Sequence, residues 1–547
     1  MKKFFILLAV FSMMVLSNVS FGQWSDTLQG NINGTVTLSE HRSYLMLGEI
    51  VVQNGATLVI PAGTYLYGDA PTKASIIVLR GGKIYAKGTA SDPIVFTSRN
   101  PVGSRAAGDW GGIVILGNAT INTNSGVDTA AIEGFSTNYY YGGNNDDDSS
   151  GCLSYCRIEF AGIALAPNNE INSLTMGGVG RKTQIDHIMV SFAGDDAVEC
   201  FGGTVNVKYF VAAFGVDDMF DTDNGYRGRF QFGLGISDPN IADVSGSNGF
   251  ESDNNSAPNY NNPRTWPFYS NMTLVGPKEY DTTTVDPNFK RGAHIRRNVK
   301  TSIWNTVWMG WPTGTLFDGT GVFNACTGDT LKYKSNIIAG CLKNIDTAGT
   351  TTTPFNANAF VFGAGQMTDT FATTQEVMLN SPYSGLNNHN YSINDFMPQG
   401  GSPVFSNFID ANTIDPFFTS TNYRGAFGSG SNWLDGGWVN FRPDTVDYSV
   451  GINQVSSNVP ERYTLSQNYP NPFNPSTVIN FSLPVKGFVT LKVYDVLGQE
   501  VATLVNNVLT VGEYAYEFDA SKLSSGIYFY TLKGENFVET KKMMLVK

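Results

Sequence analysis

The stretch that decides the fold is IDHIMVSFAGDDAVECFGGTVN at residues 185–206, followed at once by VKYFVAAFGVDDMFDTDNGYRG at residues 207–228. The two segments align on acidic pairs that repeat after 22 residues: Asp195–Asp196 and Asp217–Asp218. Apolar triplets follow the same step: Ile188–Val190, Phe210–Ala212 and Phe232–Leu234. A repeat in the low twenties that combines short strands with Gly, Asn and Asp turns is typical of one coil of a parallel β-solenoid.

The preceding residues 24–120 carry short β-type runs, each bounded by Gly, Asn, Asp or Pro. These runs are Gly34–Leu38, Leu45–Val52, Ala56–Ile60, Ser75–Leu79, Lys83–Ala86, Ile94–Thr97 and Ile113–Leu116. Residues 350–440 are rich in Thr, Asn, Phe and Gly, and we interpret them as final coils and a long-loop cap. A cap is expected because an open solenoid end exposes strand edges and core. The solenoid domain is thus predicted over residues 23–440.

Composition limits the classes of function. Hydrophobic residues make up 41% of the 547 residues and charged residues 15%, which excludes a disordered chain. The 59 glycines and 13% aromatics favour an all-β extracellular protein. The net charge of −12 argues against binding to nucleic acid and to anionic lipid, and it suits divalent cations.

The N-terminus has the pattern of a signal peptide over residues 1–22. Lys2 and Lys3 precede an apolar run from Phe4 to Leu16, and small residues then place a cleavage site between Gly22 and Gln23. The run is short for a membrane span, which needs about 20 residues. No later stretch is long and apolar enough to span a bilayer, so we expect an exported chain without a transmembrane segment.

The C-terminal residues 461–547 form a separate module, after a predicted linker over residues 441–460. Its runs alternate in polarity and are separated by turns, which predicts a small β-sandwich. The clearest runs are Val478–Leu483, Val489–Tyr494, Ala515–Phe518, Ile527–Leu532 and Met543–Val546. The whole chain is therefore predicted to be all-β, with a solenoid followed by a sandwich.

Several motifs identify families. ATLVIPAGTYLYG (56–68), GGKIYAKGTASDPIVFTS (81–98), GDWGGIVILGNATIN (108–122) and GSNGFESDN (246–254) resemble the large β-helix proteins secreted by Bacteroidetes-type bacteria. The resemblance covers roughly residues 30–350. It implies a right-handed parallel β-helix and an exported location. It implies no reaction, because that family has no established activity.

The C-terminal module resembles the type A sorting domain of the type IX secretion system. The resemblance rests on YTLSQNYPNPFNPSTVINFSLP (463–484), LKVYDVLGQEV (491–501), LSSGIYFYTL (523–532) and KKMMLVK (541–547). It implies that the type IX machinery is a partner and that the module directs passage across the outer membrane. It also implies that the module is then cleaved and replaced by a surface anchor.

Acidic residues recur at like positions of the repeat and are the main candidates for chemistry: Asp195, Asp196, Glu199, Asp217, Asp218, Asp221 and Asp223. Because solenoid coils stack about 4.8 Å apart, several carboxylates are expected to converge. They would form either an acid–base pair or a calcium site. The alternative is Asp/Asn/Gly turn chemistry that repeats because the coil repeats.

Two of these segments, GDDAV (194–198) and DTDNG (221–225), are similar to motifs of β-helix polygalacturonases. In that family a trio of carboxylates protonates the glycosidic oxygen and activates water. Here the two motifs stand in reversed order. The Gly-His-Gly and Arg-Ile-Lys segments of that family are absent from this sequence.

A second acidic run, NNDDDSSG at residues 144–151, fits the first half of a calcium loop. Asp146, Asp148 and Ser150 would supply oxygen ligands at alternate positions, and Gly151 would allow the turn. The twelfth position is Arg157, where an EF-hand needs Glu, so an EF-hand is excluded. A looser calcium loop and a solvated acidic turn remain as the two interpretations.

Cysteine and tryptophan supply the last candidates. The disulfide candidates in an exported protein are Cys326–Cys341 and Cys152–Cys156, with Cys200 left as a small buried hydrophobe. Scattered unpaired cysteines are favoured over these pairs.

Trp304, Trp308 and Trp311, with Trp266 upstream, could form an exposed row that stacks on sugar rings. Packing under a loop is favoured over this, because large aromatic side chains are usually buried.

Three functions are compatible with these patterns. The first and favoured one is a non-catalytic surface protein that binds cell-surface or environmental polysaccharide, with Ca²⁺ as its candidate cofactor. The second is a polysaccharide hydrolase or lyase, which needs a groove with convergent carboxylates. The third is a structural component of an extracellular layer or filament, which needs self-complementary patches or open sheet ends.

Overall fold

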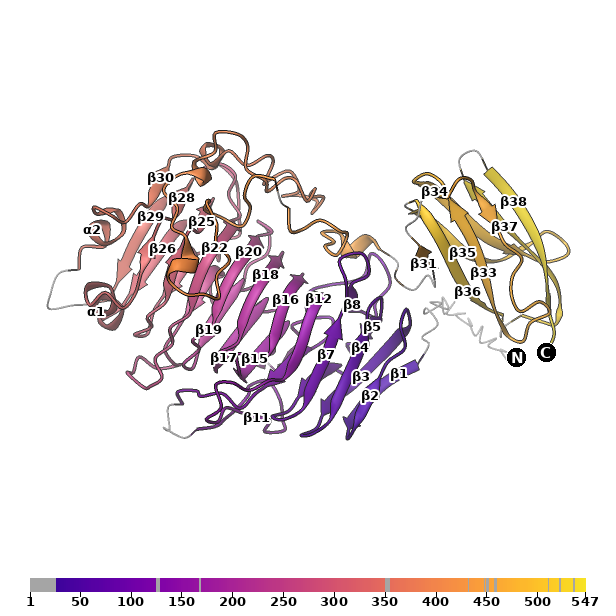
Figure 1. The fold of residues 1–547 in the computed structure, drawn as a ribbon, viewed down its shortest axis with the longest axis horizontal. Coiled ribbons are helices and arrows are strands. Elements are labelled where there is room, and N and C mark those ends of the chain that lie inside the picture. Colours follow the sequence, from indigo (N-terminus) through magenta and orange to yellow (C-terminus); the bar gives the residue numbers. More distant parts are fainter. Residues whose placement is uncertain are drawn as a thin grey trace, which may run out of the picture. The chain divides into compact units, whose positions relative to one another are not determined.

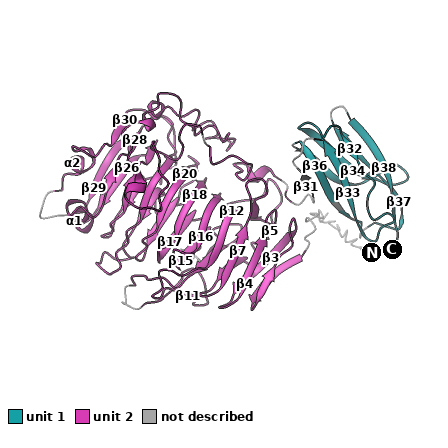
Figure 2. Cartoon of the chain, viewed as in Figure 1, with its two compact units in different colours: residues 1–24, 449–547 teal, residues 25–448 magenta. Residues whose placement is uncertain are grey.

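The computed structural model describes residues 26–123, 128–166, 169–349, 355–430, 432–446, 448, 452–456, 460–509, 511–520, 523–534 and 537–547. The chain forms two compact units, one over residues 25–448 and one that contains residues 449–547 (Figure 2). The expected signal peptide over residues 1–22, with its cleavage site at Gly22 and Gln23, lies outside the described residues.

The larger unit is a parallel β-solenoid whose coils stack in register along three faces (Figure 1). Five long strands bend from the first face into the second: β12 (Gly151–Glu159), β16 (Gln184–Ser191), β18 (Asn206–Ala213), β20 (Arg229–Ile236) and β22 (Phe268–Val275). The first face also holds β2 (Thr35–Thr37), β4 (Thr57–Pro61), β7 (Lys83–Lys87), β24 (Ser302–Trp304) and β27 (Tyr333–Lys334).

The second face is completed by β5 (Tyr65–Gly68), β8 (Ile94–Ser98), β25 (Val307–Met309), β28 (Ile337–Ala339) and β30 (Asp369–Phe371). At the N-terminal end, β1 (Asp26–Ile32) and β3 (Ser43–Val52) run from the second face into the third. The third face continues with β6 (Ser75–Val78), β9 (Gly112–Leu116), β15 (Leu174–Val179), β17 (Val198–Gly203), β19 (Phe220–Asp223), β21 (Asn248–Ser252), β23 (Arg291–Ile295), β26 (Thr313–Asp318) and β29 (Lys343–Ala348). Two short pairs, β10 (Ala130–Ala131) with β11 (Tyr140–Tyr141) and β13 (Ala164–Ala166) with β14 (Asn169–Glu170), lie in loops.

The bend between the first and second faces is made by residues with positive φ at equivalent positions: Tyr155, His187, Tyr209, Phe232 and Asn271. This conformation is uncommon outside glycine. It is offset here by stacking, since ring centroids are 4.1 Å apart for Tyr155–His187, 4.4 Å for His187–Tyr209 and 5.0 Å for Tyr209–Phe232. The third apolar triplet of the sequence repeat is therefore shifted by one residue. Phe210 pairs with Gly233, because Phe232 occupies the bend.

The core fills the inside of the solenoid. In β17, Val198 and Cys200 point inward to the main hydrophobic cluster, while Phe201 on the alternate side packs in a separate outer cluster. Burial of inward-facing apolar side chains stabilises each coil by about 1.5–3 kcal/mol per large residue. The period-2 alternation thus fixes which residues of the third face project outward, Glu199 among them.

The C-terminal end of the solenoid is covered by two short helices, α1 (Thr320–Thr327) and α2 (Ala357–Phe362). Val322 and Phe323 of α1 and Val361 of α2 join the main core cluster. Apolar side chains therefore close this end, and the cap is smaller than the sequence predicted.

The rest of the segment expected to form final coils and a cap differs from that expectation. Residues 379–430, 432–446 and 448, which we call the strap, run back along the outside of the second face, seen as the orange segment in Figure 1. Short 3₁₀ turns punctuate this part of the chain: η1 (Thr374–Val377), η2 (Pro403–Phe405), η3 (Ala411–Thr413) and η4 (Pro443–Thr445). The strap follows this path because the outward side chains of the second face, such as Met189, Val211 and Leu234, are apolar and need cover.

The smaller unit is built from two antiparallel four-stranded sheets around one apolar core. One sheet holds β31 (Ile452–Ser456), β36 (Gly512–Asp519), β33 (Ser476–Leu483) and β32 (Thr464–Leu465); the other holds β35 (Glu500–Leu509), β34 (Gly487–Tyr494), β37 (Gly526–Gly534) and β38 (Phe537–Leu545). The expected linker over residues 441–460 contributes to both units. Tyr448 is buried on the solenoid and Ile452–Ser456 is an edge strand of the sandwich. Among the helices described, none is long and apolar enough to cross a membrane.

Candidate functional site

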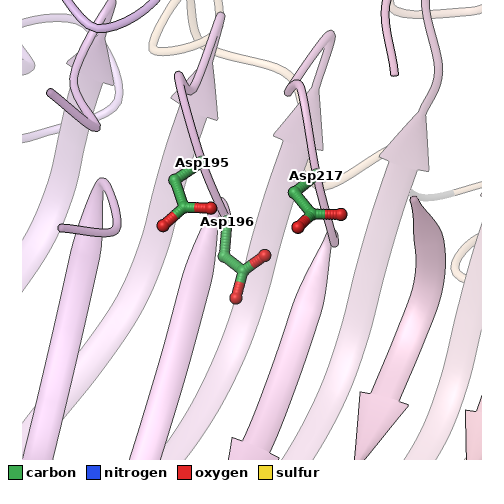
Figure 3. A group of neighbouring side chains, drawn as sticks. All are labelled: Asp195, Asp196 and Asp217. Carbon is green, nitrogen blue, oxygen red and sulfur yellow. The ribbon is translucent and has the colours of Figure 1, made fainter. Parts of the chain in front are cut away.

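The acidic pairs of the repeat lie in the turns that lead into β17 and β19 on the third face. Asp195, Asp196 and Asp217 bring one carboxylate oxygen each to within 4.8 Å of one another, and Figure 3 shows these side chains next to each other on neighbouring coils. Asp196, Glu199 and Asp221 form a second group at the same spacing. Asp196 belongs to both groups, so the sequence prediction that carboxylates converge is confirmed.

Two of these carboxylates also hold the turns together. Oδ1 of Asp196 accepts a 2.9 Å hydrogen bond from the backbone N–H of Asp218 on the next coil. Oδ1 of Asp218 accepts from the backbone and side-chain amides of Asn248, one coil further on. On the preceding side, the backbone N–H of Asp196 donates to Oδ1 of Asn172. The same aspartates therefore stabilise the turns by hydrogen bonds and lie in the cluster of carboxylates.

A second row of side chains projects outward from the strands themselves. Strand register places Thr175, Glu199, Asp221, Glu251 and His294 side by side on successive coils. Sequence reasoning missed Glu251 and His294 because the loop between β20 and β21 breaks the repeat spacing. The signal that could have found Glu251 is the motif GSNGFESDN, in which the β-type run FES repeats the position of Phe220–Thr222.

Basic side chains lie at one end of this second row. His294 Nδ1 lies 3.3 Å from the carboxylate of Glu251 and Arg296 pairs with the same group. Arg296 Nε and Arg297 Nη1 lie 2.8 and 2.7 Å from the two oxygens of Asp253. Within the described residues, no Lys, Arg or His forms an ion pair with Asp196, Glu199, Asp218 or Asp221. We call these last four, with Asp195 and Asp217, the acidic row.

Five carboxyl groups of the acidic row have raised pKa values: Asp196, Glu199, Asp217, Asp218 and Asp221. Burial and neighbouring carboxylates raise the pKa of Asp196, Glu199, Asp218 and Asp221 well above their usual values. Burial and Asp243 raise the pKa of Asp217 to about 7, and burial and Asp253 raise that of Asp223 to about 7. By contrast, burial acts against ionisation of Glu251, yet hydrogen bonding to His294 and the charge of Arg296 keep its pKa below the usual value. The row must therefore be neutralised by protons or by a cation.

The second predicted calcium segment lies elsewhere and is occupied by protein groups. Oδ1 of Asp146 accepts hydrogen bonds from Thr120 and Arg227, and the carboxylate of Asp148 accepts from Asn118. The side-chain oxygen of Ser150 is buried without a hydrogen-bond partner. Metal binding by Asp146, Asp148 and Ser150 stays a prediction. In the structure, the carboxylates of Asp146 and Asp148 accept hydrogen bonds from Arg227 and from side-chain and backbone donors of Thr120 and Asn118.

The tryptophan prediction needs correction. Trp304 is 3% exposed, and Trp308 and Trp311 are fully buried, so no exposed row exists for sugar stacking. Trp304 and Trp308 do not share a face, because a positive-φ residue, Asn305, bends the chain between β24 and β25. Trp308 instead stacks inside the core on Tyr333 at 5.4 Å. Packing, the interpretation that the sequence favoured, is the one that the structure supports.

The cysteine pairs are also corrected. The five cysteines are free thiols in the described structure. Cys152 and Cys156 stand on either side of the bend at Tyr155 and so belong to different faces of the solenoid, while Cys326 lies in α1 and Cys341 follows β28. Cys200 is fully buried in the main core cluster, as predicted for a small hydrophobe.

Comparison with known families divides the chain as its fold does. Residues 30–378 match a family model described as a pectate-lyase-like β-helix domain. Residues 467–547 match the secretion system C-terminal sorting domain. No curated protein matches the sequence. A sorting domain of this type marks secreted or cell-surface proteins and implies interaction with the type IX secretion machinery.

Two solved structures show distant similarity. The endo-β-1,4-mannanase from Thermotoga petrophila is 10% identical with a TM-score of 0.11, and the match covers 43% of this chain and 47% of that one. The chain thus spans about half the length of the mannanase. The Dettilon tailspike protein is 9% identical with a TM-score of 0.21, and the match covers 93% of this chain and 88% of the tailspike chain.

Proposed function

Because this chain belongs to the pectate-lyase-like β-helix family and ends in a secretion sorting domain, we propose that it is a cation-loaded, non-catalytic binding scaffold of the cell surface. Its cation is Ca²⁺, and its partner is a cell-surface or environmental polysaccharide. The observation that carries the proposal is the convergence of carboxylates in the acidic row. Four of them, Asp196, Glu199, Asp218 and Asp221, form no ion pair with a Lys, Arg or His of the described residues.

The donor set suits a hard divalent cation. Ca²⁺ takes six to eight oxygen ligands in flexible geometry, from carboxylates, carbonyls and water. Asp195, Asp196 and Asp217 supply carboxylate oxygens from two coils, and Asp196 joins this group to Glu199 and Asp221. No sulfur or imidazole belongs to either group. An all-oxygen set favours Ca²⁺ over zinc or copper. A bound cation would also offset the repulsion that raises the pKa values of the row.

A hydrolase or lyase is the second candidate, favoured by the pKa of Asp217 near 7, which suits a general acid or base. The geometry supports it less well. Inverting hydrolysis separates its two carboxyl groups by about 6.5–9.5 Å, whereas carboxylate oxygens within each group of three lie within 4.8 Å of one another. Asp196 and Asp218 are also engaged by backbone amides of the turns. The cavity lined by Asp217 and Asp218 measures only about 10 Å³, room for about one water.

Isothermal titration of the purified full chain with CaCl₂ in chelator-treated buffer tests the proposal. We expect saturable binding that Asp196→Asn and Asp217→Asn each weaken by about tenfold or more, because each removes a charged ligand. Asp435→Asn, an exposed carboxylate away from the row, is the matched control and should bind like the native chain. Asp148→Asn tests the second predicted segment and should also leave the affinity unchanged.

Two outcomes would contradict the proposal: no Ca²⁺ binding by a folded native chain, or native affinity in both row variants. The hydrolase candidate is tested on the same samples by release of reducing ends from polysaccharides. Turnover that is abolished by Asp217→Asn would favour the enzyme over the scaffold.

A further inference from the structure

A pocket on another side of the solenoid carries a second inference. At the corner where the third face turns into the first, eight residues line a cavity of about 410 Å³: Arg181, Thr204, Asn206, Arg227, Arg229, Trp266, Phe268 and Asp415. We propose that this pocket binds an anionic sugar unit of a polysaccharide. The inference names a partner class for the proposed scaffold, and the pocket uses no residue of the acidic row.

The stacking of coils builds this pocket as a grid. Arg229 and Phe268 are register partners on β20 and β22, and the side chain of Asn206, the first residue of β18, accepts a 3.0 Å hydrogen bond from the backbone N–H of Arg229. Two residues before each of these positions come Thr204, Arg227 and Trp266. Three successive coils spaced by about 4.8 Å give the grid a length of about 10 Å. Side chains fixed on strand ends in this way form a largely pre-formed site.

The aromatic side of the grid is an apolar platform. The rings of Trp266 and Phe268 stack with centroids 5.4 Å apart, and both are partly exposed. Nε1 of Trp266 donates to the hydroxyl of Ser302 at 3.2 Å, which fixes the orientation of the indole. Trp266 is thus available where Trp304, Trp308 and Trp311 are not. Exposed aromatic rings that are held rigidly provide contact area at low cost in side-chain entropy.

The basic side of the grid is held in place from outside. Arg181 Nη1 lies 2.7 Å from Asp147, and Arg227 Nη2 lies 3.1 Å from Asp146. Neither acid lines the cavity, so these pairs orient the guanidinium groups without occupying the pocket. Arg229 contacts the ring of Phe268 at 4.7 Å and pairs with Asp415 of the strap at 2.7 Å.

Hydrogen-bond donors remain for a ligand. Nη1 of Arg227 and Nδ2 of Asn206 make no hydrogen bond to any described residue. The ammonium of Lys300, 5.3 Å from the ring of Trp266, adds positive charge beside the platform.

The charge of the lining selects the class of sugar. Three arginines face the cavity and a single acid, Asp415, faces them, although the chain as a whole carries a net charge of −12. Guanidinium groups bind carboxylate and sulfate-type oxyanions through paired N–H donors, and Asp415 shows that Arg229 accepts a carboxylate in this place. A sugar that carries such a group would place its ring on the aromatic platform and its charge against Arg227 or Arg181.

Calorimetric titration of the full chain tests this inference with three probes. They are trigalacturonate, its neutral methyl ester and a sulfated galactotriose. Comparison of the two anionic probes separates recognition of a carboxylate from recognition of a sulfate. Comparison with the ester separates the effect of the charge from that of the sugar ring. We expect binding of at least one anionic probe and much weaker binding of the neutral ester. Arg227→Gln should weaken that binding by about 10- to 100-fold, as the loss of a charged hydrogen bond does. Trp266→Ala should weaken it by about tenfold through lost stacking.

Matched controls lie outside the pocket. Arg442→Gln breaks a partly buried pair with Asp444, and Tyr280→Ala removes an aromatic ring that is 54% exposed. Both variants should bind like the native chain. The inference is overturned if neither anionic probe binds, if the neutral ester binds as tightly as the acid, or if the two pocket variants bind like the controls. Calcium titration of the same samples separates the two proposals. Absence of sugar binding in a chain that binds Ca²⁺ counts against the pocket alone, and absence of Ca²⁺ binding in a chain that binds sugar counts against the acidic row alone.

Discussion

The hydroxyl of Tyr448 donates a 2.9 Å hydrogen bond to Oε1 of Glu159, a residue 289 positions earlier in the chain. Tyr448 ends the strap, and Glu159 ends β12 near the opposite end of the solenoid from the start of the strap. Arg157 lies 3.2 Å from the same carboxylate, and the phenol ring packs on Tyr65 at 5.6 Å. The carboxylate is fully buried. This contact therefore fixes the strap to the wall that it covers.

Replacing Tyr448 by Phe should loosen the strap. The change leaves the ring in place but removes the donor to a buried carboxylate, which costs about 1–3 kcal/mol of unfolding free energy. Limited proteolysis should then cut residues 379–448 faster than in the native chain. Tyr260→Phe, at an exposed ring, is the control. Equal cleavage rates in native chain and Tyr448→Phe would show that the hydrogen bond does not hold the strap.

The acidic row predicts how stability depends on pH. The pKa of Asp217 is raised to about 7 in the folded chain, so folding favours its protonated form. This contribution is complete below the ordinary pKa of Asp and is lost as the pH rises through about 7. In chelator, the melting temperature should therefore fall between about pH 5 and about pH 8, and Ca²⁺ should reduce the fall. Asp217→Asn should flatten the profile; an unchanged profile in this variant would contradict the assignment.

Asp196 separates hydrogen bonding from charge. Its Oδ1 accepts from the backbone of Asp218, and an asparagine side chain offers the same acceptor. Asp196→Asn should therefore keep or slightly raise stability in Ca²⁺-free buffer, whereas Asp196→Ala should cost about 1–3 kcal/mol by leaving a buried N–H unpaired. Chemical denaturation of the two variants side by side measures the difference. Equal destabilisation in both would mean that the charge, and not the acceptor, supports the turn.

Truncation of two tryptophans should affect stability by different amounts. Trp308 is fully buried and stacks on Tyr333, so Trp308→Ala should lower the unfolding free energy by about 3–5 kcal/mol. Trp266 is partly exposed, so Trp266→Ala should cost much less stability while weakening sugar binding by about tenfold. Thermal melts read with the binding titrations check both. A large stability loss in Trp266→Ala would mean that this ring is a core residue.

Deletion of the sorting domain should change the compartment in which the chain accumulates. Removal of residues 461–547 deletes the matched secretion module and leaves the solenoid unit complete. The truncated chain should accumulate in the periplasm, while the full chain reaches the cell surface or the medium. Fractionation with antibody detection measures the distribution. Surface delivery of the truncated chain would show that another segment carries the signal.

The repeat of residues 185–228 was sufficient to predict the solenoid. Its 22-residue step sets the strand register across β16, β18, β17 and β19, and the same step predicts that Asp195 and Asp217 meet. The C-terminal module could be predicted because its strands alternate in polarity and its motifs stand in a known order. Both patterns involve residues that are close to one another in the sequence. Such patterns can be recognised without knowledge of the tertiary structure.

Tertiary structure decided the rest. The path of the strap depends on contacts such as Tyr448 with Glu159, and no local signal relates residues 289 positions apart. The burial of Trp308 depends on a one-residue bend at Asn305, and a shift of one residue exchanges the inner and outer sides of a strand. The arginine and aromatic grid around Arg229 and Trp266 depends on which coils stack after irregular loops. The sequence by itself therefore determined the β-solenoid fold and the presence of a sorting domain. Long-range packing decided which side chains line the proposed ligand sites.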